Sequence, residues 1–355
     1  MDYRIMNQII FKAGKKDYSF KDCLQFIACH KGLEMIYKEI QQSLVCEEYA
    51  NDEGFECQKD TLHAEMVKFR CHYNLLTAEE TEQWLSKRSL TTADLMNYLE
   101  RQYWYQRFQT TIPQIMYEYS ISEKDVISYL WPHLILSGIL NEFIRHFSRR
   151  VASLLELHSE TIPNDIIDQV KAQFVQKIKQ KSDSIDQWLQ ANHMDINALG
   201  KIIELEAAYL HYCNGILTHE SMVQCMEQQQ LLLIKIEASI AQFQQKEIAE
   251  EAFLCITEDN EPFASVTQRS SKKVEKSVLM LKYLPDFIQQ ILISTAEESI
   301  TKPIYYNKQF VIFNVIRKIM PDINDPEIKM IIQNELLNQQ FKPLVNTHIR
   351  FTFHS

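Results

Sequence analysis

The stretch from Leu231 to Met320 constrains the fold most, because strand-like and helix-like patterns alternate in it at short intervals. Its apolar run Leu231–Ile236 suits a half-buried strand. Pro285 lies where a helix can begin, since proline at a helix start loses no needed N–H group. The sequence therefore predicts, in order, a strand at 231–236, helices at 244–257, at 263–266 and from Pro285, and strands at 300–304 and 310–316.

The rest of the chain is predicted to be mostly helical. Its 355 residues exceed the usual size of a single domain, which predicts two or three units. The whole chain contains only six glycines and nine prolines, a composition that favours helices. Neither G-x-G-x-x-G nor G-x-x-x-x-G-K-[ST] occurs, so glycine-rich phosphate-binding loops are excluded. The expected fold class is α+β, mostly helical.

The charge of the chain argues against nucleic acid as a partner. The formal net charge is −10 and the pI is near 5.6, whereas phosphate binding needs clustered Lys and Arg. No window approaches about eighteen uninterrupted apolar residues, and the N-terminus has no apolar signal region, so we expect no membrane partner. We expect the protein to stay in the cytoplasm.

The eight cysteines are scattered along the chain, which suits reduced cytosolic thiols better than a disulfide framework. Cys23, Cys29, His30, Cys46 and Cys57 lie near the N-terminus, but they include no C-x-x-C pair and no paired-ligand spacing. We therefore expect no metal and no cofactor.

Local signals mark helices in the first two thirds of the chain. Thr77 and Glu80 can form a capping box, in which the threonine bonds the N3 amide and the glutamate reaches back. Pro132 interrupts a later helical pattern, which predicts a kink or two helices. Residues 83–105 align with 187–209 without gaps, including a Trp-Leu pair, which indicates two copies of one helical-pair unit. Chance agreement between two amphipathic helices is the alternative.

The order of elements within 231–320 resembles the parvulin family of peptidyl-prolyl isomerases. The resemblance rests on Phe263, Leu284–Phe287, Ile300–Pro303 and Phe310–Val315. These residues match short sequence motifs of the family, and they occur in the same order. Residues 76–108 are similar to the helical module of SurA-type chaperones. Together these matches imply a PpiC/SurA-like protein in which a SurA-like helical cradle carries a degenerate parvulin α/β domain. Within the family, the peptide-maturation subgroup is the one suggested.

This resemblance gives the expected domain organisation. We predict an N-terminal helical segment at 1–60, a helical module with a candidate duplicated helix pair at 61–227, a parvulin-like domain at 228–320, and a C-terminal helix and strand at 321–355. In SurA-like proteins the corresponding tail packs back on the helical module, and the same is expected of residues 321–355.

The chain departs from the family where catalysis is concerned. Parvulins usually carry one histidine in the first strand and another in the last, facing each other across the proline pocket. Residues 231–240 contain no histidine, and the last-strand position falls on Val311. Ser270–Lys276 replaces the family's glycine-rich loop. The catalytic residues are therefore unknown, and whether the protein is an enzyme stays open.

The resemblance does imply a peptide-binding set. Phe287 of the family's pocket remains, and Tyr283 stands where the family often has methionine. With Phe310 and Val311 of the last strand, these residues are the candidate peptide contacts. The alternative is that they are core residues of a small α+β domain, because aromatic side chains are buried more often than they contact ligands.

A second candidate is a basic cluster on a helix. Arg145, Arg149 and Arg150 lie at helical spacing and can contact an acidic peptide. The alternative is a solvated face, or pairing with local carboxylates.

The resulting interpretation is a SurA/parvulin-like peptide-binding chaperone or accessory protein of ribosomal-peptide maturation. Its partners would be an extended or precursor peptide and other maturation proteins. Three alternatives stay open: an active peptidyl-prolyl cis/trans isomerase, a helical scaffold or interaction protein, and a peptide-modifying enzyme.

Overall fold

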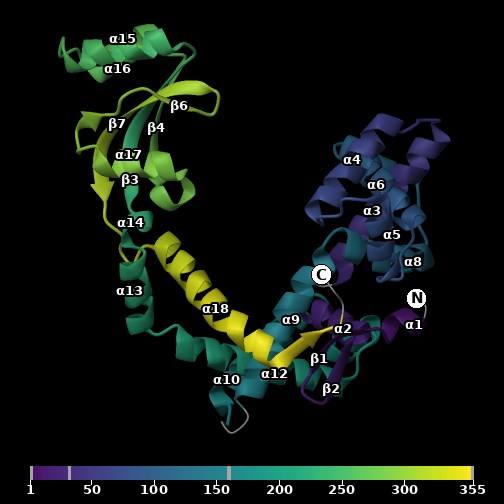
Figure 1. Ribbon diagram of the computed structural model, residues 1–355. Helices are drawn as coiled ribbons and strands as arrows, with labels where there is room; N and C mark the ends of the chain where they lie inside the picture. Colours follow the sequence, from purple (N-terminus) through teal and green to yellow (C-terminus); the bar gives the residue numbers. More distant parts are fainter. Residues whose placement is uncertain (1–2, 31–32, 158–160, 353–355) are drawn as a thin grey trace. The chain divides into compact units, whose positions relative to one another are not determined.

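The computed structural model describes residues 3–30, 33–157 and 161–352. The chain forms two compact units, and the fold is α+β and mostly helical, as predicted (Figure 1). Unit 1 comprises Met1–Cys213 and Phe341–Ser355, and unit 2 comprises Asn214–Gln340. Each unit has its own sheet and its own core, and each is described by itself.

Helices make up most of unit 1. In chain order its elements are α1 (Tyr3–Met6), β1 (Ile9–Ala13), β2 (Lys16–Ser19), α2 (Phe20–His30), α3 (Leu33–Asp52), α4 (Lys59–His72), α5 (Ala78–Ser86), α6 (Thr92–Arg107), α7 (Ile112–Glu118), α8 (Glu123–Leu136), α9 (Ile139–Glu156), α10 (Asn164–Lys179), α11 (Ile185–Ala191) and α12 (Ile196–Ile216), whose last turn enters unit 2. Helix α3 packs against α6, α7 and α8, and α2 packs against α9.

A small antiparallel sheet in unit 1 joins the two ends of the chain. Its strand order is β2-β1-β8, where β8 is Ile349–Phe351 and follows the long helix α18 (Pro326–His348). Gly14, at φ +58°, opens the two-residue turn between β1 and β2, a position that glycine occupies without strain. The first 60 residues, predicted as an N-terminal helical segment, also contain a β-hairpin.

The predicted helix signals in unit 1 are found in the structure. Thr77 and Glu80 form a capping box at the start of α5. Pro132 lies inside the single helix α8, so the predicted interruption does not divide it. Ser89 follows the end of α5, and His193 follows the end of α11. The two residues are equivalent in the aligned segments, and both have a positive φ (55° and 48°). Because such left-handed helix ends are common, the shared turn is compatible with duplication and with chance.

Unit 2 is built around a five-stranded antiparallel sheet. Its elements are α13 (His219–Gln228), α14 (Gln230–Leu233), β3 (Lys235–Phe243), α15 (Lys246–Thr257), α16 (Phe263–Ser270), β4 (Lys273–Met280), the 3-10 turn η1 (Leu281–Tyr283), α17 (Asp286–Ser294), β5 (Ser299–Ile300), β6 (Ile304–Tyr306), β7 (Gln309–Ile319) and the first part of α18. The strand order is β4-β3-β7-β5, and β6 also pairs with β7.

Helices cover both faces of this sheet (Figure 1). On one face, Ile288 and Leu292 of α17 pack against Ile236 of β3 and Phe313 of β7. The opposite face packs against α15 and α16, with residues Ala241, Phe243, Ala249, Ala252, Val266 and Ile312 in its core. Side chains alternate between the two faces along each strand. On β7, Val311, Phe313 and Val315 therefore face α17, whereas Phe310 and Ile312 face α15 and α16.

Three local predictions in unit 2 are wrong. The strand predicted at 300–304 is divided into β5 and β6, because residues 301–303 lie outside both strands. Leu231–Leu233 belong to the helical turn α14, and the first strand begins only at Lys235. The segment Lys273–Met280, for which no strand was predicted, forms β4. Its side chains are mostly exposed because β4 lies at the edge of the sheet, so its sequence lacks the apolar alternation that marks a half-buried strand.

Candidate peptide-binding site

The candidate site is organised by helix α17. Pro285 precedes its first residue with φ −59° and ψ 146°, so the extended chain turns into the helix at this point. Ile288 and Leu292, four residues apart, face the core and anchor the helix on the sheet. Phe287 lies beside this buried stripe, and 47% of the residue remains exposed. The helix thus presents an aromatic ring at the surface of unit 2.

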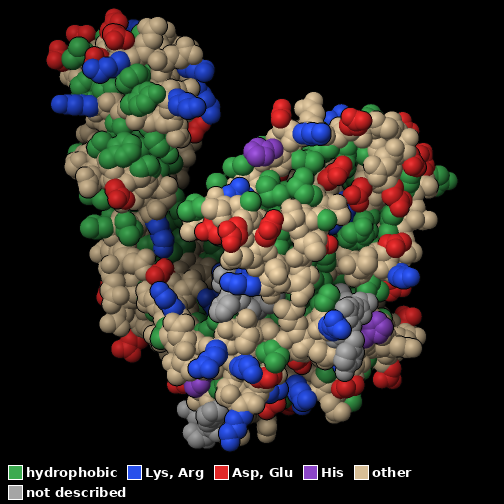
Figure 2. Space-filling model, turned by 45° about the vertical axis from the view of Figure 1, so that its right-hand side comes forward, with side chains coloured by type: hydrophobic (Ala, Val, Ile, Leu, Met, Phe, Trp, Pro, Cys, Tyr) green, Lys and Arg blue, Asp and Glu red, His purple; other side chains and the backbone are tan. Residues whose placement is uncertain are grey.

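Phe287 forms one wall of a surface hollow of about 600 Å³. Ile291 and Thr295 continue that wall along α17. The other wall is the segment from Ile300 to Tyr305, which includes Pro303. On the face of unit 2 visible in Figure 2, hydrophobic side chains gather with Lys and Arg side chains near them. The hollow has the size of a ligand site and a mainly apolar lining.

Thr301 holds the second wall in place. Its backbone N–H donates to the Phe313 carbonyl at 2.8 Å, and its hydroxyl accepts from the Phe313 N–H at 3.0 Å. The threonine is buried and fills the gap between β5 and β6 along the edge of β7. These two hydrogen bonds to one residue of the central sheet fix the position of Ile300–Tyr305.

The lining restricts the chemistry that the hollow can perform. Its residues offer no carboxylate, imidazole or thiol, and the titratable side chains among them are Lys302 and Tyr305. General acid–base catalysis is carried out most often by histidine or a carboxylate, and neither lines the hollow. The apolar walls suit an extended segment of peptide, proline rings included.

The four predicted peptide contacts fall in three environments. Phe287 lines the hollow, and Tyr283 is 64% exposed in η1, just before α17. Val311 is buried in the core beneath α17 and pairs with Ile304, while Phe310 packs on the opposite face with the α15 and α16 core. Neighbouring residues of a strand point to opposite faces, so Phe310 and Val311 cannot contact the same ligand atom.

Tyr305 is, with Ile291 and Thr295, one of the residues of the hollow that sequence reasoning missed. It stands opposite Phe310 across the β6–β7 pair, and the two ring centroids are 5.1 Å apart. Phe310 therefore supports the wall of the hollow through Tyr305. The Ile300–Pro303 step was recognised in the sequence, but no pattern marked the tyrosine that follows it.

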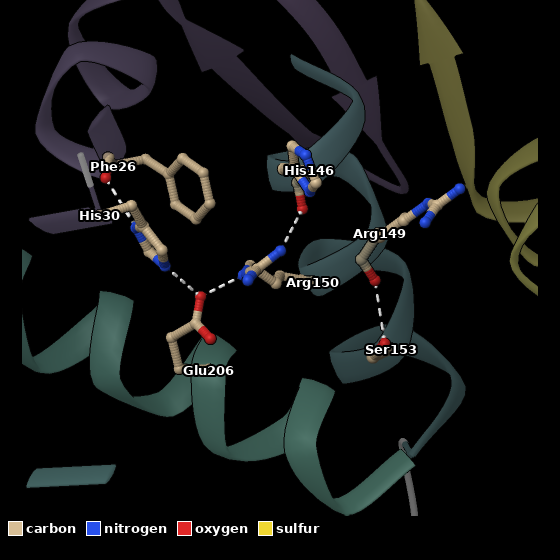
Figure 3. A network of polar contacts seen from close by, with 7 residues as sticks. All are labelled: Phe26, His30, His146, Arg149, Arg150, Ser153 and Glu206. Atoms are coloured by element: carbon tan, nitrogen blue, oxygen red, sulfur yellow. Dashed lines mark hydrogen bonds and ion pairs between the residues drawn. The ribbon is translucent and has the colours of Figure 1, made fainter. Parts of the chain in front are cut away.

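Arg150 of the basic cluster on α9 is engaged in internal contacts (Figure 3). Arg150 donates to the Glu206 carboxylate and, at 2.9 Å, to the His146 carbonyl. Its guanidinium lies 4.3 Å from the Tyr209 ring centroid. His30 contacts the same Glu206 oxygen from α2. Arg150 therefore ties α9 to α12 within unit 1.

The surroundings of Glu206 show how this network is balanced. Burial alone would raise the pKa of the carboxyl, but the hydrogen bond from His30 and the positive charge of Arg150 outweigh burial and lower the pKa. Arg149 stacks over Phe341 at 5.3 Å, whereas Arg145 is exposed. Of the three arginines, only Arg145 is on the solvent side of α9.

One group among the described residues has the composition of a metal site. Ligand atoms of Cys255, Asp259 and Glu261 lie within 4.8 Å of one another. Arg269 already forms an ion pair with Glu261 at 2.7 Å and, through that hydrogen bond, lowers the pKa of its carboxyl. A guanidinium at this position disfavours a bound cation, so we assign no metal to the group.

Comparisons with known proteins identify structural neighbours. No family model and no curated protein matches the sequence. The peptidylprolyl isomerase PrsA from Bacillus cereus is 12% identical, with 58% of this chain and 81% of that chain covered and a TM-score of 0.36. The foldase PrsA from Streptococcus pneumoniae is 12% identical (64% and 89% covered, TM-score 0.27). SurA-like chaperones of Campylobacter jejuni give 11% identity (67% and 92% covered, TM-score 0.20).

These neighbours are described as a peptidylprolyl isomerase, a foldase and SurA-like chaperones. In the described part of the chain, no helix combines the length and apolarity that crossing a membrane requires.

Proposed function

We propose that unit 2 binds extended peptide segments at the hollow beside α17 and that the protein acts as a chaperone-type peptide holder. The observation that carries the proposal is the exposed ring of Phe287 on the wall of a mainly apolar hollow of about 600 Å³. Burying an aromatic side chain away from water lowers the free energy, so a ring left exposed beside a hollow is available for contact with a ligand.

The peptide in question is proposed to be a precursor in ribosomal-peptide maturation, held for other maturation proteins. The resemblance to parvulins that lack the histidine pair supports this assignment. A cytoplasmic location is part of the same proposal, and it is supported by the cysteines, all eight of which are free.

The second candidate is an active peptidyl-prolyl isomerase. Rotation about a prolyl bond faces a barrier of about 18–20 kcal/mol that arises from amide resonance and requires no proton transfer. An apolar wall can lower this barrier by removing water from the amide. Phe287 and Pro303 on facing walls of the hollow favour this candidate.

One pair of assays separates the two candidates. Binding of a short proline-containing peptide and its cis/trans isomerisation are measured on the full chain and on Phe287→Ala and Tyr283→Ala. The matched control is Tyr117→Ala, because Tyr117 is 93% exposed on α7 of unit 1 and lines no part of the hollow.

The proposal predicts saturable binding that Phe287→Ala weakens about tenfold, with the control unchanged and no turnover. Turnover abolished by both unit 2 variants would establish the isomerase instead. Binding that none of the variants affects would show that the hollow is not the binding site.

A further inference from the structure

Unit 2 has a second surface suited to a peptide, the outer edge of its sheet. Strand β4 pairs with β3 on one side, and no described strand pairs with its other side. The β3–β4 ladder runs from Lys235 opposite Met280 to Gln242 opposite Lys273 without a register shift. Protein sheets usually protect their edges with prolines, bulges, very short strands or charged side chains, lysine above all. Along its ladder β4 has no proline and no bulge and spans eight residues, so Lys273 and Lys276 are the protection it carries, and they would not repel an acidic strand.

The hydrogen-bond pattern shows which backbone groups this edge offers. Leu281 donates its N–H to the Ile234 carbonyl at 3.1 Å, so the backbone of Leu281 points toward β3. In an antiparallel ladder the inward and outward residues alternate. The backbone N–H and C=O groups of Val274, Lys276 and Val278 therefore point away from β3, toward the open edge.

The same three residues share one face of the sheet. Val274 and Val278 are 44% and 54% exposed, with Lys276 between them. An added strand would meet their backbone groups and their side chains together. Directly opposite residues on paired strands interact, so the strand that fits carries an apolar residue, an acidic residue and an apolar residue at positions i, i+2 and i+4.

Charge supports the acidic middle position. Lys276 contacts Glu237 at 2.8 Å, and Arg317 binds the same carboxylate at 2.5 Å. Two cations thus share one anion, which leaves a net positive charge beside the edge. Lys272, just before the strand, adds to it, whereas Lys273 forms an ion pair with Glu275.

A second copy of this chain fits the edge poorly. An antiparallel pair of β4 strands that places Val274 opposite Val278 of the copy also places Lys276 opposite its own equivalent. Like charges directly opposite each other destabilise a strand pair.

We infer that the outer edge of β4 binds an extended peptide as an additional strand and selects an apolar–acidic–apolar pattern at alternate positions. This inference rests on the proposed peptide-binding function and gives it a sequence preference. Main-chain hydrogen bonds would supply affinity, and Val274, Lys276 and Val278 would supply specificity.

The test uses two synthetic peptides, one with a valine–threonine–glutamate–threonine–valine centre and one with lysine in place of the glutamate. Their affinities for the full chain are measured by calorimetry, and amide hydrogen exchange is followed at Val274, Lys276 and Val278. Lys276→Pro removes an outward N–H without touching the β3 ladder, and Lys276→Ala keeps the N–H as the matched control. Thermal melts by circular dichroism confirm that both variants fold.

We expect the glutamate peptide to bind at least tenfold more tightly than the lysine peptide and to slow exchange of the three amides. Lys276→Pro should lose at least tenfold in affinity, Lys276→Ala about threefold, and Lys276→Glu should reverse the preference between the peptides. Equal binding of both peptides, unchanged binding by Lys276→Pro, or peptide-independent dimers in sedimentation would each overturn the inference.

The proline-containing peptide of the earlier assay, measured on the same variants, separates the two proposals. If it binds and depends on Phe287 while the edge peptides fail, the edge inference alone is wrong. If the edge peptide binds and the proline-containing peptide does not, the edge stands and the hollow is wrong as the binding site.

Discussion

The arginines of α9 and the aromatic surface at α17 were both predicted to contact peptide, but they differ in how far contacts within the fold occupy their side chains. Arg150 finds a carboxylate, a carbonyl and an aromatic ring within unit 1. Phe287, in contrast, keeps about half of its surface exposed beside a hollow. A side chain whose interactions are satisfied internally stabilises the fold, and one left exposed on a shaped surface is available to a ligand.

The largest expected effect comes from removing Glu206. In Glu206→Ala the partly buried Arg150 and His30 lose their shared carboxylate; breaking a fully buried pair costs about 3–5 kcal/mol, and we expect the lower end of that range here. All four tryptophans, Trp84, Trp104, Trp131 and Trp188, lie in unit 1, so tryptophan fluorescence during urea unfolding reports that unit alone.

Glu204→Ala, at an exposed carboxylate on the same helix, is the control and should change the free energy of unfolding by less than about 0.5 kcal/mol. Peptide affinity at unit 2 should be the same in both variants. A loss of peptide binding in Glu206→Ala without a loss of stability would show that the arginine network is the binding site.

A second effect depends on pH. Burial, assisted by the positive charge of Arg101, lowers the pKa of His133 from 6.5 to about 4. The unfolded chain therefore takes up a proton before the folded chain does as the pH falls from 6.5 toward 4, and stability is lost in that window. The loss reaches about 3 kcal/mol at its lower end.

The measurement is the difference in unfolding free energy between pH 7 and pH 4.5, read from tryptophan fluorescence. Comparison with His133→Phe isolates this histidine from the carboxylates that titrate in the same range. The variant should lose about 2 kcal/mol less than the original chain on acidification. An equal loss in both proteins would show that His133 does not drive the acid sensitivity of unit 1.

Thr301→Val tests the wall of the hollow. The substitution removes the hydroxyl that accepts from the Phe313 N–H, and an unsatisfied buried donor costs about 1–3 kcal/mol. Faster amide exchange at Phe313 and weaker binding of the proline-containing peptide are expected together. Slow exchange with weakened binding would mean that the threonine contacts the peptide rather than positioning the wall.

The smallest effect is expected at Arg145. It is the exposed arginine of the cluster, so Arg145→Ala should change stability by less than about 0.5 kcal/mol and leave the affinity for an acidic peptide unchanged within about twofold. A tenfold loss of affinity for that peptide, measured by calorimetry, would show that the basic cluster binds peptide.

Local chemistry made part of this fold predictable. The threonine cap of α5 and the proline start of α17 act over a few residues, so the sequence was enough to find them. The hairpin at Gly14 was not predicted, because its strands β1 and β2 are short and depend on pairing with β8 at the other end of the chain. Strand β4 was missed because an edge strand is exposed and carries lysines.

The site was predictable only in part, for a related reason. The proline–phenylalanine step identified Phe287 from sequence alone. Which of Phe310 and Val311 faces α17 depends on the register of β7, which is set by its pairing with β3. The carboxylate that pairs with Arg150 comes from α12, 56 residues further along the chain, so no local pattern could show that this arginine is already occupied.

Photo-crosslinking would test the central claim most directly. A proline-containing peptide with a benzophenone side chain is bound to the full chain, irradiated, and its attachment points are found by mass spectrometry. The account predicts crosslinks to the segment from Tyr283 to Tyr305, which are lost when unlabelled peptide competes. Crosslinks confined to Arg145–Arg150 of α9 would contradict it.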